Sequence, residues 1–418
     1  MGKKKFLLAL VVSFLIALPM LSGCVPEEVA PPPPPPEEEK YVTYLSLADY
    51  TGAIAGLNVP ADAGLKAYFD YLNDRGGVEG IKIKMIAVDT RYDAARAVSA
   101  YRRYGREHKL LLINAIGTHL DKAVAPLTMK DKICCFCPLD GEFAAHPGMG
   151  LLWFMSYQDM FGAALDWMVE DWKAKGNPGM PTVGYYHWDN PHGHEALRGG
   201  KEYAAKLGVN LLPPEFNPPG TLDHSVPLTR LAEGGANYIY IGGIDPNSTI
   251  VLKSAYDLGL TEKIQFIADI WGPTETVGMR LYPEAVEGCI VNSPILKGDD
   301  ARNHPLAKEL LPYLGVSSAD MNAWMLGMAA SWGMTTEAGI KKALEMGVSY
   351  EELDGSAFYE AIQKCTGYDK QGIMGPIAYT ETQRRQSWEV KFYQFQNHKA
   401  VAITDWRRCP DTVSLYAW

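Results

Sequence analysis

Hydrophobic residues recur at two spacings along this chain, and the two patterns take turns in a regular order. Residues 41–48 form a β-branched and aromatic run that predicts a strand, and residues 61–73 place apolar side chains at helical spacing. Further strands are predicted at 81–88, 110–116, 133–137, 181–187, 209–212, 238–242 and 263–267. Predicted helices lie between them at 93–108, 157–175, 195–207, 225–233 and 248–258. One more helix, after the strand at 110–116, is predicted to end at residue 130. This alternation indicates α/β architecture with doubly wound parallel sheets.

The C-terminal part of the chain follows a different pattern. Long helices are predicted around 321–338 and 356–363, followed by strands at 388–394 and 400–404. The 418 residues are enough for two or three domains, and no short-period repeat is visible.

The first 24 residues read as an export signal. A positive segment, Lys3–Lys5, precedes the apolar run Phe6–Met20, which is shorter than the roughly 20 residues needed to span a bilayer as a helix. The run ends in Leu21–Cys24, which resembles the bacterial lipobox, in which the cysteine is acylated. Acyl chains on Cys24 would hold the mature protein on a membrane. A plain membrane anchor with a chance cysteine is the alternative.

Residues 25–40 are rich in proline and glutamate. The six prolines Pro31–Pro36 favour an extended polyproline II conformation, and the flanking glutamates keep the segment hydrated. We interpret it as a tether between lipid and folded domain, with a proline-rich ligand for another domain as the alternative. The folded part is expected to begin near Tyr41.

Composition excludes some classes of protein. Hydrophobic residues make up 47% and charged residues 21%, as in an ordinary soluble globular protein. The net charge of −10 becomes −13 once the three signal lysines are removed. A nucleic-acid binder needs a basic face, so this acidic balance argues against nucleic acid as a partner.

Several motifs then resemble a known family. Gly76–Gly80, followed by hydrophobic alternation into Asp89-Thr90, resembles a signature of extracytoplasmic solute-binding proteins of the leucine/isoleucine/valine-binding type, which serve ABC importers. Other matching loops, in similar order, are Thr51-Gly52 with Gly64, Gly117–His119 and Met374–Pro376. The resemblance covers roughly residues 41–406.

The resemblance implies a fold and a division of the chain. It implies the type I periplasmic binding protein fold: two doubly wound parallel-sheet lobes joined by three crossovers, with a ligand cleft between them. We expect a signal peptide at 1–24 and a tether at 25–40. Lobe 1 would hold 41–158 and 296–390, and lobe 2 would hold 159–295 and 391–412.

Ligands of such folds sit at the carboxyl ends of strands, where helix N-termini attract anions. The resemblance implies that the loops 117–121 and 138–142 clamp a ligand carboxylate. Thr118 offers a hydroxyl, and the backbone N–H groups of Leu139, Asp140 and Gly141 can cradle an oxygen. Alternatively, Thr118 simply caps the next helix, and one hydroxyl can do both.

The sequence departs from the family pattern at three positions. Asp121 falls where the family places a carboxylate-binding serine (or Leu120 if the alignment shifts), Asp140 at a small polar position and His192 at an aromatic one. A negative charge there repels a carboxylate unless it points away or binds an amine. Asp245 or Asn247 falls where the family supplies an acid to the ligand ammonium, or else forms a turn. This acidity favours a ligand with a cationic or hydrogen-bond-donating end.

Aromatic residues complete the candidate site. Tyr50, Tyr157 and Trp271 fall near predicted strand ends, where they either wall a ligand or pack between the lobes. The full set of predicted ligand-binding residues is Tyr50, Asn58, Thr118, His119, Asp121, Leu139, Asp140, Gly141, Tyr157, His192, Asp245, Asn247 and Trp271.

Histidines and cysteines cluster without a metal motif. His187, His192 and His194 match no familiar metal spacing, so we interpret His192 and His194 as cleft-lining or capping residues and expect neither metal nor cofactor. Apart from Cys24 there are six cysteines, and Cys134, Cys135 and Cys137 share one predicted strand. Six cysteines allow 15 disulfide connectivities. Free buried thiols are the preferred interpretation, ahead of a redox centre.

The sequence contains no nucleophile elbow, Walker-type loop or His-Glu-x-x-His motif. We therefore expect no enzyme. The resemblance, together with the export signal, implies a lipid-anchored extracytoplasmic protein that captures a small organic solute, an amino acid or related amide or acid. It would deliver the solute to the transmembrane subunits of an ABC permease by hinge closure. A surface-tethered sensor that passes closure to a signalling partner is the alternative, and an exported hydrolase is a third hypothesis.

Overall fold

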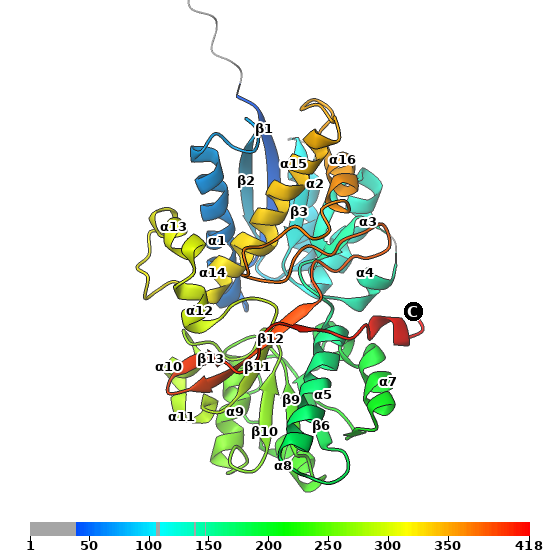
Figure 1. Cartoon of the computed structure of the whole chain (residues 1–418), viewed down its shortest axis with the longest axis vertical. Coiled ribbons are helices and arrows are strands. Elements are labelled where there is room, and N and C mark those ends of the chain that lie inside the picture. The colour runs from blue at the N-terminus through cyan, green and yellow to red at the C-terminus, as the bar shows by residue number, and fades with distance from the viewer. Residues whose placement is uncertain (1–38, 106–108, 138, 147) are drawn as a thin grey trace, which may run out of the picture. The chain divides into compact units, whose positions relative to one another are not determined.

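The computed structural model describes residues 39–105, 109–137, 139–146 and 148–418. The predicted signal peptide, the lipidation site Cys24 and all but the last two positions of the predicted tether lie outside these residues. Within residues 39–418 the strands form two separate sheets, seen in the upper and lower halves of Figure 1.

The first sheet is entirely parallel. Its strand order is β2-β1-β3-β4-β5, so the chain winds in both directions from β1. Almost every residue of β1, β3 and β4 is buried, as expected for strands covered on both faces. The strands are β1 (Tyr41–Ala48), β2 (Lys82–Asp89), β3 (Leu110–Ala115), β4 (Cys134–Cys137) and β5 (Gly150–Leu152).

Helices from two distant parts of the chain cover this sheet. Four come from between its strands: α1 (Ala55–Asp74), α2 (Ala94–Tyr104), α3 (Thr118–Asp131) and α4 (Gly141–Ala145). A later segment supplies α12 (Gly298–Arg302), α13 (Pro305–Leu314), α14 (Ala323–Met328), a π-helical turn (Ala329–Met334), α15 (Thr335–Glu345) and α16 (Gly355–Ile362). In that segment α13, α14 and the π-helical turn pack on α1, and α16 packs on β3 and β4 (yellow and orange in Figure 1).

The second sheet is mixed. Its order is β13-β12-β11-β10-β9-β6-β7, with β8 also beside β6 and β14 beside β12. The strands from β6 to β11 pair in parallel, whereas β12 is antiparallel to β11, β13 and β14. They are β6 (Thr182–Trp188), β7 (Asn210–Leu211), β8 (Glu215–Asn217), β9 (Tyr238–Ile241), β10 (Gln265–Ala268), β11 (Ile290–Ser293), β12 (Glu389–Gln396), β13 (Lys399–Ala402) and β14 (Arg407–Arg408).

The helices of this half alternate with the strands along the chain. They are α5 (Tyr157–Ala174), α6 (Pro191–Glu195), α7 (Leu197–Leu207), α8 (Ser225–Glu233), α9 (Asn247–Asp257), α10 (Gly278–Leu281) and α11 (Pro283–Val286), with a 3₁₀ turn at Val413–Leu415. The predicted α/β architecture with two doubly wound lobes is confirmed, and the second sheet is mixed instead of wholly parallel because β12 runs antiparallel to its neighbours. The exact lobe boundaries stay a prediction.

Local differences from the sequence-based expectation have physical reasons. The first helix begins at Ala55 instead of residue 61, and it accommodates Pro60 in its second turn without the backbone hydrogen bond that proline cannot donate. The helix predicted at 195–207 is interrupted where Gly199 takes a φ of 92°, which only glycine adopts readily. A Cβ at Gly199 would lie 2.1 Å from the carbonyl oxygen of Thr412, so the break lets the C-terminal segment approach.

The contact between α1 and α14 depends on a glycine. A Cβ at Gly64 would lie 2.0 Å from the carbonyl oxygen of Met325, a backbone atom that cannot move aside locally. We expect Gly64→Ala to lower the free energy of unfolding by about 1–3 kcal/mol or more, measured by urea denaturation. Gly56→Ala is the matched control, because that glycine of α1 has no neighbour near its Cβ position. It should instead stabilise the protein by about 0.4–1 kcal/mol. Equal effects of the two substitutions would contradict the close packing.

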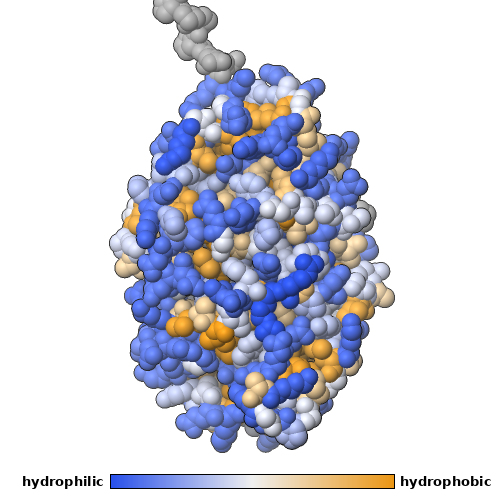
Figure 2. Space-filling view, viewed as in Figure 1, coloured by the Kyte–Doolittle hydropathy of each residue, from blue (hydrophilic) through white to orange (hydrophobic). Residues whose placement is uncertain are grey.

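Polar residues cover most of the face shown in Figure 2, and hydrophobic residues are exposed there in small separate patches. Among the described residues, no helix has the length and apolar character needed to cross a bilayer.

Candidate functional site

Loops from the carboxyl ends of strands in both sheets meet around one small cavity, which we call the inner pocket. This is the edge at which open parallel sheets bind ligands. The cavity measures about 20 Å³, which is room for about one water molecule. Its lining consists of Ile54, Leu57, Tyr92, Ile116, Gly117, Thr118, Trp153, Tyr157, His192, Ile244 and Trp271.

Aromatic rings form much of the wall and contact one another across it. The indole N–H of Trp271 donates to the hydroxyl of Tyr157 over 3.1 Å. The Tyr157 ring lies 4.5 Å from that of His192, and Trp153 meets Trp271 edge to face at 6.1 Å. Because Trp153 follows β5 of the first sheet and Trp271 follows β10 of the second, their contact joins the two halves of the molecule at the pocket.

A buried carboxylate, that of Asp269, is hydrogen-bonded to two residues of the pocket wall, His192 and Trp271. Asp269 follows directly after β10, and its Oδ1 accepts the backbone N–H of Trp271 over 2.9 Å. Its Oδ2 lies 3.3 Å from Nε2 of His187 and 3.2 Å from Nε2 of His192. Burial opposes ionisation of Asp269, but the hydrogen bonds from both histidines outweigh it and lower its pKa. Burial, with His192 nearby, lowers the pKa of His187 to about 4, so His187 is neutral near pH 7.

His187, His192 and Asp269 lie close enough to hold a metal ion, but their hydrogen bonds fit a different role. The backbone N–H of Trp188 donates to Nδ1 of His187 over 2.8 Å, so the proton of this neutral ring is on Nε2. A metal-bound imidazole needs Nε2 free and its proton on the other nitrogen. The arrangement therefore fits a hydrogen-bonded cluster that orients His192, and we infer no metal there.

A second, larger cavity lies on the other side of a tryptophan pair. Trp271 of the inner pocket stacks on Trp324, with ring centroids 5.1 Å apart and planes 14° from parallel. Trp324 faces a cavity of about 380 Å³, the outer pocket, which is also lined by Pro273, Thr274, Glu275, Thr276, Arg280, Lys297, Gly298, Arg302, Ala319, Asp320, Met321, Asn322, Ala323, Phe395, His398, Lys399 and Ala400.

Lys297 is the unusual residue of the outer pocket. Its side chain is 95% buried, its ammonium group lies 5.2 Å from the centre of the Trp324 ring, and within the described residues it forms no ion pair. Burial lowers the pKa of Lys297 to about 8, against the opposing effect of Glu275, Asp245 and Asp269. The outer pocket thus presents a buried cation beside an aromatic face.

Of the predicted site residues, the structure brings four together. Thr118, Tyr157, His192 and Trp271 all line the inner pocket; the first three lie on α3, α5 and α6, and Trp271 lies in the loop after β10. Leu139 and Gly141 lie nearby in the fold: the Leu139 carbonyl accepts the N–H of Tyr157, and a Cβ on Gly141 would collide with Gln158.

The predicted acidic residues lie outside the pocket lining. Asp121 is buried under β4, 3.8 Å from the sulfur of Cys135. Asp140 caps α4 and pairs with Lys122 over 2.9 Å. Asp245 accepts hydrogen bonds from Thr249 and Thr274. The argument that local acidity favours a cationic ligand end therefore loses its structural basis.

The other predicted residues also lie outside the lining. Tyr50 donates its hydroxyl to Asp62, and the His119 ring bonds to the carbonyl of Tyr92 over 3.1 Å. The side-chain amides of Asn58 and Asn247 are buried and have no hydrogen-bond partner within the described residues. Their roles in binding stay a prediction.

Sequence reasoning missed several residues of the two pockets. Asp269 carries a simple signal, a carboxylate directly after a buried strand, but the sequence comparison assigned the ligand-binding acid to Asp245. Tyr92 adopts a left-handed φ of 59°, which no sequence pattern indicated. Lys297 follows β11, a strand too short and polar to be predicted.

Comparison with known proteins identifies the family. The periplasmic binding protein family profile matches residues 46–400. The chain belongs to this family.

Individual relatives are distant in sequence but similar over most of their length. The chain is 19% identical over 365 residues to the Leu/Ile/Val-binding protein homolog 3 of Brucella melitensis, covering 87% of this chain and 93% of the relative. Among solved structures, a branched chain amino acid ABC transporter from Thermus thermophilus with bound valine has a TM-score of 0.79 at 18% identity, covering 90% of this chain and 98% of that one. A fatty acid ABC transporter substrate-binding protein from Thermomonospora curvata has a TM-score of 0.76 at 17% identity, covering 90% and 94%. These structures establish the shared fold.

Proposed function

We propose that this protein captures a small organic solute, an amino acid or a related amide or acid, between its two lobes and delivers it to an ABC importer. Closure of the lobes on the solute would create the form that the permease subunits recognise. The protein would act by binding alone and catalyse no reaction. The family match and the names of its relatives support this proposal.

The observation that carries the proposal is the composition of the inner pocket. Thr118 comes from the first sheet, His192 and Trp271 from loops of the second, and Tyr157 from the helix that follows the first sheet. A solute in this position touches both halves at once, so binding favours the closed arrangement. The pocket holds about one water molecule as it stands, so a solute must enter while the lobes are apart or displace the aromatic side chains.

The location of the protein belongs to the same proposal. An exported chain with acyl groups on Cys24 would be tethered to the outer face of a membrane by residues 25–40, near its permease. The lobes proposed at 41–158 with 296–390 and at 159–295 with 391–412 then place three crossing segments at the hinge.

The charges around the pocket narrow the solute class. Asp269 already accepts three N–H groups, so it has little capacity left for a ligand ammonium. Lys297 has no ion-pair partner within the described residues. It is separated from the inner pocket by the stacked rings of Trp271 and Trp324. Within the proposed range we therefore favour apolar or aromatic acids and amides over solutes with a cationic end.

A thermal-shift screen tests the proposal. Amino acids, amides, short acids and aromatic acids are added in turn to the purified protein, and the melting temperature is recorded. We expect at least one compound to raise it, because a ligand at 100 times its Kd stabilises by about 2.7 kcal/mol. No shift across the whole panel would count against solute binding.

A variant pair locates the bound solute. Trp271→Ala should weaken binding of the compound found in the screen about thirtyfold or more, as expected for a central aromatic anchor worth about 2 kcal/mol. Trp172→Ala is the control, since that residue lies 15 positions after Tyr157 on α5, about 22 Å along the helix. Isothermal titration calorimetry measures both. Unchanged affinity in Trp271→Ala would place the solute elsewhere.

A further inference from the structure

Two thiols lie at the base of a groove that the solute site does not use. The groove has a volume of about 410 Å³ and runs between α3, β4 and the segment after α4. Cys135 and Cys137 are two positions apart on β4, so their side chains point to the same face of the sheet, and both line the groove. The rest of the lining is mainly apolar and includes Met129, Phe143 and Met149.

A carboxyl group completes the cluster. Asp121 of α3 lies under β4, and one ligand atom each of Asp121, Cys135 and Cys137 lies within 4.8 Å of the others. The Cys135 sulfur is 3.8 Å from Oδ1 of Asp121. Tetrahedral zinc bonds of about 2.3 Å to sulfur and 2.0 Å to oxygen place those two donors about 3.5 Å apart. The Cys135–Asp121 separation is therefore within a few tenths of an ångström of the spacing that a bound ion needs.

The Asp121 carboxyl group is otherwise unexplained. It is completely buried, and its Oδ2 has no hydrogen-bond partner within the described residues. Burial, with the neighbouring Cys137 and Asp140, raises the pKa of this carboxyl group. Buried polar groups normally have partners, and a cation would supply the missing one.

We propose that Asp121, Cys135 and Cys137 bind a thiophilic divalent cation such as Zn²⁺ or Cd²⁺, which enters through the groove. Thiolate sulfur is the donor that such ions prefer. The ion would form two bonds to sulfur and one to a carboxylate oxygen, and its fourth position would face the groove. Two thiolates and one carboxylate carry three negative charges, so the site loaded with a divalent cation carries a single negative charge. Lys122, whose ammonium group pairs with Asp140 and Glu142, lines the same groove.

Cadmium titration tests the site directly. The purified, reduced protein is titrated with Cd²⁺ while the ultraviolet thiolate-to-cadmium charge-transfer band is recorded. We expect one Cd²⁺ per chain. Cys135→Ser, Cys137→Ser and Asp121→Asn should each weaken binding at least about tenfold, since even residues that only support a ligand contribute that much. Cys134→Ser is the matched control, because Cys134 is equally buried on the same strand but faces the opposite core. It should leave the band and the affinity unchanged.

Two outcomes would overturn the proposal: no charge-transfer band in the wild type, or a band that is lost in Cys134→Ser but kept in the other variants. Should the serine variants fail to fold, alkylation of the wild type decides instead. Bound Cd²⁺ should slow alkylation of Cys135 and Cys137, located by mass spectrometry, and leave that of Cys134 unchanged. Equal alkylation with and without Cd²⁺ would contradict the site.

Discussion

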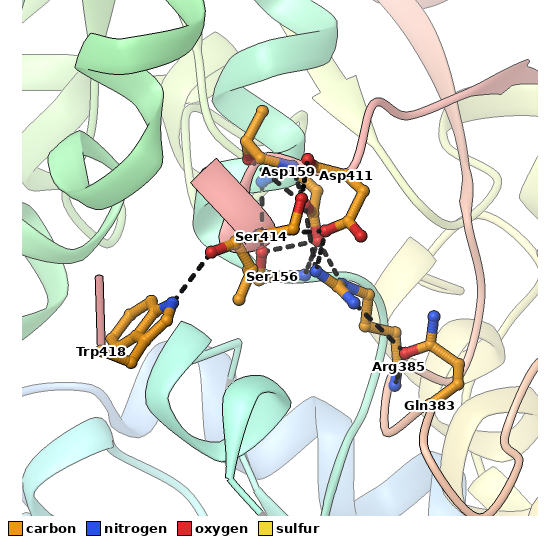
Figure 3. Close-up of polar contacts among 9 residues, drawn as sticks. Ser156, Asp159, Gln383, Arg385, Asp411, Ser414 and Trp418 are labelled. Atoms are coloured by element: carbon orange, nitrogen blue, oxygen red, sulfur yellow. Dashed lines mark hydrogen bonds and ion pairs between the residues drawn. The ribbon is translucent and has the colours of Figure 1, made fainter. Parts of the chain in front are cut away.

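Replacing Arg385 with alanine is expected to lower the free energy of unfolding by about 3–5 kcal/mol, because it leaves a buried carboxylate without its cation. The Arg385 guanidinium forms an ion pair with Asp159, whose side chain is fully buried, and Nη2 reaches Asp411 over 2.8 Å (Figure 3). Ser156 and Thr412 also donate to Asp159. The network therefore fixes the start of α5, and with it the position of Tyr157 in the inner pocket. Urea denaturation followed by circular dichroism measures the effect.

A second arginine that pairs with an acidic residue of α5 provides the control. Arg407 pairs with Glu170 of α5 at the surface, where the glutamate side chain is 59% exposed. Arg407→Ala should change stability by no more than about 1 kcal/mol. The double variant Asp159→Asn with Arg385→Met should be more stable than Arg385→Ala, since no buried charge is left without a partner. A loss in Arg385→Ala no greater than in Arg407→Ala would show that the buried pair contributes little.

Periodicity along the chain predicted the elements well where a strand or helix is long and strongly patterned. The strand at 41–48 and the helix at 225–233 have the predicted bounds. Among the strands that were missed, β5, β8 and β11 have three or four residues each and include glycine or polar positions. Such segments become strands because a neighbouring strand supplies hydrogen bonds, and local sequence does not contain that information.

The site was predictable only in part, for a related reason. The position of a residue after a strand can be seen in the sequence, which is why Thr118, Tyr157, His192 and Trp271 were found. The direction in which a side chain points cannot be seen in the sequence. Asp245 accepts a hydrogen bond from Thr274, whereas Asp269 is hydrogen-bonded to His192. The Asp159–Arg385 pair joins positions 226 residues apart, and no local pattern connects them.

The lowered pKa of Lys297 leads us to expect that the free energy of unfolding rises with pH in the alkaline range. Its pKa is about 8 in the folded protein and 10.5 ordinarily, so between these pH values the unfolded chain holds one more proton than the folded one. The free energy of unfolding should therefore rise with pH through this window, by about 3 kcal/mol from this group. Lys297→Met removes the buried ammonium and should abolish the rise. At pH 7 it should be more stable than the wild type by up to the same amount. Denaturation at a series of pH values, taken as the difference between the two proteins, isolates the lysine from other titrating groups.

The variant Lys297→Arg keeps a positive charge at this position, so it distinguishes the effect of the charge from the effect of replacing the lysine. Arginine stays protonated across this range, so the variant should show neither the alkaline rise nor the gain at pH 7. At pH 10.5 it should be less stable than the wild type, which has by then lost its buried charge. An identical pH profile in the wild type and Lys297→Met would contradict a strained, unpaired ammonium group. It would also weaken the preference for anionic solutes, because that preference rests on an uncompensated cation beside Trp324.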